Sequence, residues 1–170
     1  MGNADKGLVK YQGKPLIQHV IETIEPQVQN IVVNCNRNET EYENLSYPIA
    51  KDLSGEYRGP LEGILSCKHL IKSDYIFVAP CDMPHLPANI VSILSKNLDE
   101  AELCVAHDGI RMQPLVFVAR AQLIESIDEY LNKGGRSVSN WIRSKDHEVV
   151  DFSRQQTAFW NINEESQLSN

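Results

Sequence analysis

Runs of apolar residues alternate along the chain with segments in which apolar positions recur every three or four residues. The apolar runs predict strands at 29–35, 47–52, 74–80, 102–107, 114–119 and 148–152. Helical spacing is found at 15–24, 39–45, 59–72, 87–98, 123–131 and around Trp141. Strands that alternate with helices are typical of a mostly parallel sheet covered by helices, so the pattern predicts an α/β fold.

The first of these helices shows the pattern most clearly. It begins near Pro15, a residue that suits the first turn of a helix, and its apolar residues share one face. These residues are Leu16, Ile17, Val20, Ile21 and Ile24.

The second half of the chain departs from simple alternation. Only a short loop separates the strands at 102–107 and 114–119, which leaves no room for a crossover helix, so we expect an antiparallel pair and a mixed sheet. The 170 residues contain no repeat or linker, and their length suits one domain with its own core.

Composition and charge narrow the function. A formal net charge of -7 argues against general nucleic-acid binding, which needs a basic face. No apolar run approaches the roughly 20 residues that a membrane span needs, and the first residues do not resemble a signal peptide. The four cysteines form no Cys-x-x-Cys pair, which favours reduced thiols in the cytoplasm over a zinc site or disulfides.

An acidic protein can still bind a small phosphorylated ligand. Exposed charges beyond about 8 Å are largely screened at physiological salt. One lysine within about 4 Å of a phosphate gains about 4 kcal/mol at an effective dielectric of 20. A few local cations therefore outweigh the net charge.

Three predicted strands end in polar residues that could contact a ligand, at Asn34, Asp52 and Asp82. In open sheets of this type, ligands bind outside the carboxyl ends of the strands. Asn34 and Asp52 also have a simpler interpretation, because Asn and Asp are common turn formers after a strand.

Asp82 is harder to explain as a turn residue. Six apolar or aromatic residues precede Cys81 and Asp82, and Pro84 and Pro87 stiffen the backbone that follows. A carboxylate in a rigid position suits Mg²⁺, which takes one or two carboxylates together with substrate phosphates. No histidine is placed by a motif to activate Cys81, so we expect a spectator thiol.

Basic residues offer further candidates, each with an ordinary alternative. Lys6 in "NADKG" and Lys14 in "GKP" lie in turn-like polar segments where a lysine is usually solvated. Arg136 lies in the Gly-Gly loop "NKGGRSV" before a helix, where it could bind an anion or simply belong to a helix-entry loop.

Together these segments resemble the molybdenum cofactor guanylyltransferases, the MobA-type proteins, over nearly the whole chain. The matching segments are "DKGL" at 5–8, "GKPLIQHV" at 13–20, "VVNCNR" at 32–37, Asp52 with "GPLEGI" at 59–64, "PCDMPHLP" at 80–87, "HDG" at 107–109 and "NIN" at 161–163. "GKPL" alone would be weak, since many nucleotidyltransferases have it, but seven segments in family order are specific.

The resemblance implies a three-layer, Rossmann-like nucleotidyltransferase fold and transfer of GMP from GTP to the phosphate of molybdopterin, with release of pyrophosphate. It implies Lys6, Asn34, Asp52 and Asp82 as nucleotide contacts, with Lys6 and Asp82 catalytic and Asp82 the Mg²⁺ ligand. By the same resemblance, the molybdopterin contacts are Gln113, Arg136, Asn161 and Asn163. In-line attack on the α-phosphorus requires no protein nucleophile.

The resemblance also implies partners and one departure. GTP and molybdopterin, with or without molybdenum, are the expected ligands, and the enzymes that supply the cofactor or receive it are further partners. The family begins with an apolar strand and a glycine loop, whereas this chain opens with "MGNADKG". We therefore expect one domain over residues 1–170 that lacks the first strand and most of that loop.

Two alternatives stay open at this point. A related nucleotidyltransferase would use CTP or activate a sugar phosphate, and the base preference depends partly on the missing loop. A non-catalytic module would bind the pterin cofactor with the second half of the chain alone.

Overall fold

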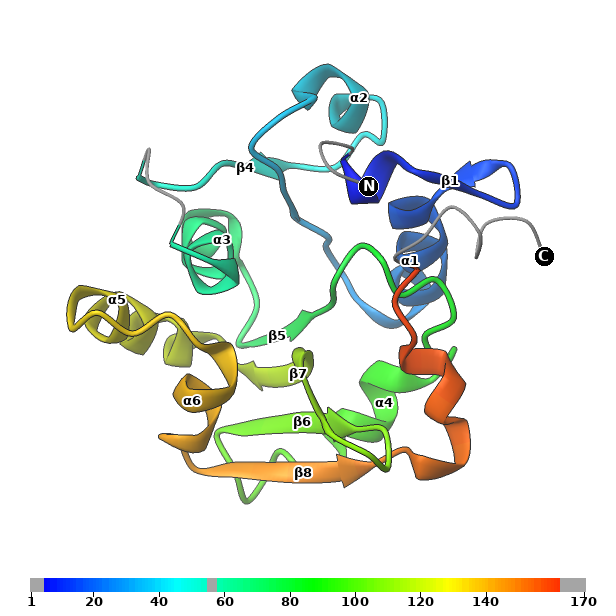
Figure 1. Ribbon diagram of the computed structural model, residues 1–170. Coiled ribbons are helices and arrows are strands. Elements are labelled where there is room, and N and C mark those ends of the chain that lie inside the picture. Colours follow the sequence, from blue (N-terminus) through cyan, green and yellow to red (C-terminus); the bar gives the residue numbers. More distant parts are fainter. Residues whose placement is uncertain (1–4, 55–57, 163–170) are drawn as a thin grey trace.

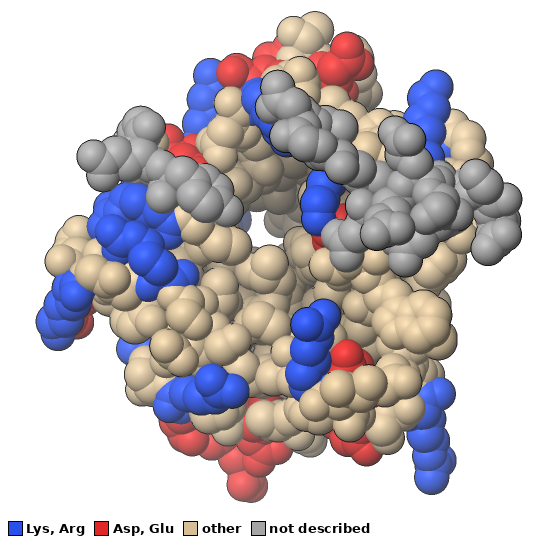
Figure 2. Space-filling model, viewed as in Figure 1, with Lys and Arg blue, Asp and Glu red and all other residues tan. Residues whose placement is uncertain are grey.

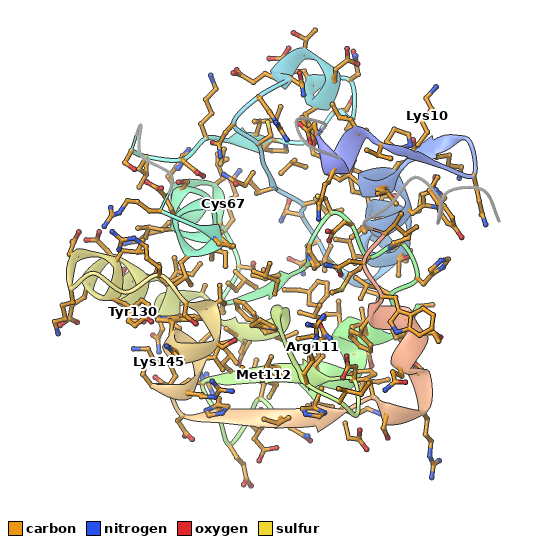
Figure 3. The ribbon with its side chains drawn as sticks, viewed as in Figure 1. Lys10, Cys67, Arg111, Met112, Tyr130 and Lys145 are labelled. Atoms are coloured by element: carbon orange, nitrogen blue, oxygen red, sulfur yellow. The ribbon has the colours of Figure 1, made fainter. Side chains whose placement is uncertain are left out.

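The centre of the fold is a four-stranded mixed sheet, seen in a computed structural model that describes residues 5–54 and 58–162 (Figure 1). The strands lie in the order β5-β7-β6-β8 and comprise β5 (Tyr75–Val78), β6 (Leu103–His107), β7 (Met112–Arg120) and β8 (His147–Asp151). β7 is antiparallel to β5 and β6, while β8 is parallel to β6. The predicted antiparallel pair and mixed sheet are confirmed, and Arg111 and Met112 mark the hairpin in Figure 3.

Helices cover both faces of this sheet, which gives the three layers that were expected (Figure 1). On one face, side chains of β6 and β7 pack with α4 (Ile90–Ser95) and with η5 (Ser153–Phe159), through Cys104, Ala106, Val116 and Val118. On the other, Leu103, Val105, Phe117 and Ala119 pack with α3 (Pro60–Ser66), α5 (Glu125–Asn132) and α6 (Val138–Arg143). Burial on both faces explains why these strands are apolar at nearly every position.

The helices form where the apolar spacing predicts them, with shorter bounds. α1 (Leu16–Ile24) follows Pro15, as expected. The segment 59–72 divides into α3 and a 3-10 turn, η3 (Lys68–Leu70), and α5 is preceded by η4 (Ala121–Ile124). Gly134, with a φ of 87°, follows α5 in the left-handed conformation that commonly ends a helix.

The N-terminal part of the chain forms two small sheets beside the main one. β3 (Val33–Asn34) and β4 (Ile49–Ala50) are parallel and lie on either side of α2 (Glu39–Glu43) in the sequence. The pair β1 (Lys10–Tyr11) and β2 (Lys14–Pro15) is a hairpin that the apolar pattern did not predict. Its turn residues Gln12 and Gly13 both have positive φ, the backbone of a two-residue hairpin turn.

An apolar cavity of about 790 Å³ separates β3 from β5. Its walls are the segment before and including β3, all of β5, and parts of α1 and α3, and Figure 2 shows the molecule hollowed in this region. Cys67, at the end of α3, is a wall residue labelled in Figure 3. The prediction of a strand over the whole of 29–35 is wrong in extent, because only Val33 and Asn34 have a pairing strand in the described structure.

None of the described helices combines the length and the apolar character that crossing a membrane requires.

Candidate functional site

Lys6 and Asp82, 76 positions apart in sequence, form an ion pair. Lys6 lies in the 3-10 turn η1 (Lys6–Leu8), and Asp82 follows the strand β5. The Lys6 Nζ lies 3.4 Å from the Asp82 Oδ2. Asp82 is only 7% exposed, while the Lys6 side chain is 45% exposed. A buried carboxylate thus faces a cation that reaches the surface, an arrangement that could receive a metal-bound polyphosphate.

The backbone around Asp82 is fixed by burial and by the C-terminal segment. Met83 and Leu86 belong to the core that includes α4. The Ile162 amide donates a hydrogen bond of 3.1 Å to the Asp82 carbonyl oxygen. Neighbouring Asn161 has a buried Oδ1 atom with no hydrogen-bond partner within the described residues. A buried acceptor of this kind is costly unless a donor reaches it, so Asn161 is suited to contact a ligand.

Cys81 has the environment of an unreactive thiol. Burial, followed by the charge of Asp82, raises the pKa of Cys81 to about 11. The thiol is therefore protonated at neutral pH, which agrees with the expected spectator role.

Asn34 and Asp52 form a second polar pair, at the ends of β3 and β4. The Asn34 side-chain amide donates to Asp52 Oδ1 over 3.1 Å and to the Ala50 carbonyl over 3.2 Å. The Asp52 amide in turn donates to Asn36 Oδ1 over 2.8 Å. The parallel register, which aligns Asn34 with Ala50, accounts for this meeting. Both residues were predicted from sequence, and the structure places them together.

Each of the two pairs lies next to the cavity wall. Asn34 and Cys81, the neighbour of Asp82, both line it, whereas Lys6 and Asp82 themselves do not. The cavity walls are mainly apolar, so the volume itself does not identify the chemical site. The polar pairs beside it are the candidate chemical site.

Glu62 supports the loop after Asp52 and was not selected from the sequence. It is 1% exposed and accepts hydrogen bonds from the Ser54 amide, at 2.9 Å, and the Arg58 amide, at 3.2 Å. Burial alone would raise the pKa of Glu62, but these hydrogen bonds outweigh it and lower the pKa. The sequence did contain a signal for this role, because Glu62 lies within "GPLEGI" on an otherwise apolar helix face. A charged residue at such a position is seldom buried without partners.

Two of the predicted molybdopterin contacts, Gln113 and Arg136, make hydrogen bonds within the protein. Gln113 is 3% exposed, and its side-chain amide donates to Asp108 Oδ2 over 2.6 Å. Arg136 is exposed and donates to the carbonyl oxygens of Leu131 and Gly135 at the end of α5. None of these hydrogen bonds connects Gln113 or Arg136 to the Lys6–Asp82 pair. Asn163 lies outside the described residues.

The donor set around Asp82 is compatible with Mg²⁺. Within 5–54 and 58–162, no group of three or more His, Cys, Asp or Glu side chains is arranged to bind a metal on its own. One carboxylate is nevertheless sufficient where substrate phosphates and water complete the coordination, as is usual for Mg²⁺. Asp82 therefore fits an ion that arrives with a nucleotide better than one bound by protein ligands alone.

A three-layer α/β fold with polar side chains at its strand ends is typical of nucleotide-binding proteins of the Rossmann-like class. Residues 1–149 match the family described as the MobA-like NTP transferase domain. The chain belongs to this family.

Curated relatives support this membership. The chain is 40% identical over 165 residues to a protein of Shewanella sediminis named molybdenum cofactor guanylyltransferase, and 42% identical over 165 residues to one of the same name from Shewanella woodyi. Each match covers 96% of this chain and 84% of the relative.

Solved structures share the fold at lower identity. Molybdopterin-guanine dinucleotide biosynthesis protein A from Archaeoglobus fulgidus has a TM-score of 0.76 at 21% identity, covering 98% of this chain and 88% of that one. The 2-C-methyl-D-erythritol 4-phosphate cytidylyltransferase from Thermus thermophilus has a TM-score of 0.75 at 13% identity, covering 96% and 90%. The predicted nucleotidyltransferase fold is confirmed.

Proposed function

We propose that this protein is a nucleotidyltransferase that transfers GMP from GTP to the terminal phosphate of molybdopterin, with release of pyrophosphate. The observation that carries the proposal is the Lys6–Asp82 pair at the end of β5, in a chain of the MobA-like family. The names of the Shewanella relatives support the choice of GTP and of the molybdenum cofactor as substrates.

In this proposal, Asp82 and Lys6 neutralise phosphate charge. Asp82 would bind Mg²⁺, which supplies positive charge to the triphosphate. The Lys6 ammonium group, at the exposed side of Asp82, would stabilise the charge that develops on the departing pyrophosphate. The attacking group is a phosphate oxygen of molybdopterin, so the reaction needs no protein nucleophile. The protein contributes by positioning the reactants and by neutralising charge. The protonated Cys81 thiol has no part in this chemistry.

Asn34 and Asp52 would contact the nucleotide next to this centre. Their amide and carboxylate groups offer a donor and acceptors at adjacent strand ends, which suits the polar edge of a base or a ribose. Asn161, whose buried Oδ1 has no hydrogen-bond partner among residues 5–54 and 58–162, is the predicted molybdopterin contact that the geometry supports best. For Gln113, Arg136 and Asn163, the contact with molybdopterin stays a prediction.

The cellular setting follows from the same proposal. We expect the protein to act in the cytoplasm, where its four free cysteines would stay reduced. Molybdopterin would arrive from the enzymes that synthesise it, and the dinucleotide product would pass to the proteins that mature molybdoenzymes.

The test is release of pyrophosphate from GTP by the purified protein with Mg²⁺ and molybdopterin, with CTP assayed in parallel. We expect GTP to be used and CTP to be used poorly. Asp82→Asn preserves the shape of the side chain but removes its charge, so it should lower activity by about 100-fold or more while changing the melting temperature little.

Four results would contradict parts of this assignment. Absence of pyrophosphate release from GTP would exclude the activity, and preference for CTP would move the protein to a related reaction. Binding of molybdopterin without any Mg²⁺-dependent binding of GTP, measured by calorimetry, would instead indicate a cofactor carrier. A large fall in melting temperature in Asp82→Asn would mark Asp82 as structural.

A further inference from the structure

The turn that carries Lys6 is contacted on both sides by one buried side chain, Tyr42 of α2. Tyr42 is 4% exposed, and its hydroxyl group donates a hydrogen bond of 2.7 Å to Asp5 Oδ1, on the residue before Lys6. On the other side, a Cβ added to Gly7 would lie 2.5 Å from the same hydroxyl oxygen. One oxygen atom therefore contacts the residues on both sides of Lys6: it donates to the Asp5 carboxylate and lies against the backbone of Gly7.

Asp5 has further partners from the same region of the chain. Asn38, the residue before α2, donates to Asp5 Oδ2 over 3.1 Å, and the Nε atom of Arg37 lies 3.6 Å from that oxygen. Both carboxylate oxygens of Asp5 are thus engaged, and its side chain is only 14% exposed. Asp5 is therefore an anchor for the turn rather than a second carboxylate directed at a ligand.

The same turn contacts the segment that carries Asp82. The Cβ added to Gly7 would lie 3.5 Å from the Cβ and Sγ atoms of Cys81. Gly7 is buried, so a side chain here would push the turn away from both Tyr42 and Cys81. Burial, and then the hydrogen bond to Asp5, raise the pKa of Tyr42, so its hydroxyl group keeps the proton that it donates.

We infer that Tyr42 is the positioning residue for Lys6. Through Asp5 and Gly7, it sets the place of the turn relative to Cys81 and thereby the 3.4 Å approach of Lys6 to Asp82. The lysine side chain is long and flexible, so its ammonium group can occupy many positions around the Cα atom. The position of the Lys6 backbone therefore determines how often this group lies near the reacting phosphates. The catalytic part of this inference rests on the proposed function.

The first test removes only the hydroxyl group, with Tyr42→Phe. The ring stays in the apolar cluster that it forms with Ile17, Ile21, Val33 and Cys35. Tyr47→Phe is the matched control, because the Tyr47 hydroxyl also donates a short hydrogen bond, of 2.6 Å, to a carboxylate, that of Glu25. We expect Tyr42→Phe to lower kcat on the order of 10-fold with little change in the KM for molybdopterin, and Tyr47→Phe to match the natural protein.

A double variant separates positioning from a general structural effect. If Tyr42 acts through Lys6, then Lys6→Ala combined with Tyr42→Phe should be no slower than Lys6→Ala alone. Losses that multiply in the double variant would overturn the inference, and so would a Tyr42→Phe variant with unchanged kcat.

A third measurement does not need activity. The acetylation rate of the Lys6 amine by acetic anhydride, read by mass spectrometry against exposed Lys10 in the same molecule, reports whether the Lys6–Asp82 pair forms. We expect Lys6 to react faster in Tyr42→Phe and at the natural rate in Tyr47→Phe. If the natural protein releases no pyrophosphate, the proposed function fails, while an unchanged Lys6 rate in Tyr42→Phe would overturn the positioning role on its own.

Discussion

At the scale of single residues, the buried carboxylates Glu62 and Asp108 are stabilised by hydrogen bonds from backbone amides and from a side chain. Glu62 accepts hydrogen bonds from two backbone amides, and Asp108 accepts from the Ile110 and Arg111 amides and from Gln113. For Asp108, as for Glu62, hydrogen bonds outweigh the effect of burial and lower the pKa. Such carboxylates stabilise the fold only while they are ionised.

Glu62→Gln tests this conclusion. Because the folded-state pKa of Glu62 is lowered, its ionised form contributes stability above the ordinary glutamate value of about 4.3, and this contribution is lost as the pH falls through the lowered pKa. We expect Glu62→Gln to be about 1–2 kcal/mol less stable at pH 7. Below the lowered pKa, the difference from the natural protein should shrink.

Urea unfolding at several pH values measures the effect, with exposed Glu100→Gln as the control that should stay near the natural protein throughout. A difference for Glu62→Gln that is independent of pH would show that shape, rather than charge, explains the role of Glu62.

At the scale of elements, β5 has the sequence of an interior strand but borders the cavity. Residues 75–80 are apolar or aromatic, yet only one side of β5 pairs with another strand in the described structure. The Ala121 amide donates to the Asp74 carbonyl, so the alternation of an antiparallel ladder directs the amides of Ile76 and Val78 to β7. The amides of Tyr75 and Phe77 then point toward the cavity.

Hydrogen exchange measured residue by residue by NMR should show this alternation. We expect the Phe77 amide to exchange faster than the amides of Ile76 and Val78, because no strand in the described part of the chain pairs with that side of β5. Val105 of β6, which has strands on both sides, serves as the protected reference. Equal protection of Phe77 and Val78 would show that the cavity edge of β5 is paired in solution.

At the scale of the whole molecule, the cavity lies between the small sheet of β3 and β4 and the main sheet that begins at β5. The segment 29–35 and β5 face each other across about 790 Å³ instead of forming hydrogen bonds with a shared neighbour. Protein interiors are normally close-packed. Side chains that border a cavity of this size are therefore less tightly packed than those inside the main sheet.

Two cysteine substitutions test this difference. Cys67→Leu adds apolar volume at the cavity wall and should be neutral or stabilising by about 0.5–2 kcal/mol. Cys104→Leu adds the same atoms at a fully buried position of β6 and should destabilise the protein by about 1–3 kcal/mol. Urea unfolding provides both values. Equal destabilisation would show that the region near Cys67 is as closely packed as the sheet.

The sequence by itself determined the parts of this protein that depend on neighbouring residues. Apolar spacing predicted α1 and the α/β fold, and the short loop between two apolar runs predicted the antiparallel pair β6 and β7. The positions where apolar runs end predicted Asn34, Asp52 and Asp82, because a polar residue after a buried strand is visible in the sequence alone.

Only the tertiary structure decided which distant residues meet. The pairing of Lys6 with Asp82, the contact of Tyr42 with Asp5, and the burial of Gln113 against Asp108 depend on how elements pack, and no local pattern records it. The short length of β3 has the same origin, because a strand persists only where another strand accepts and donates its hydrogen bonds. Local propensity therefore set the elements of this protein, and long-range packing set its candidate site.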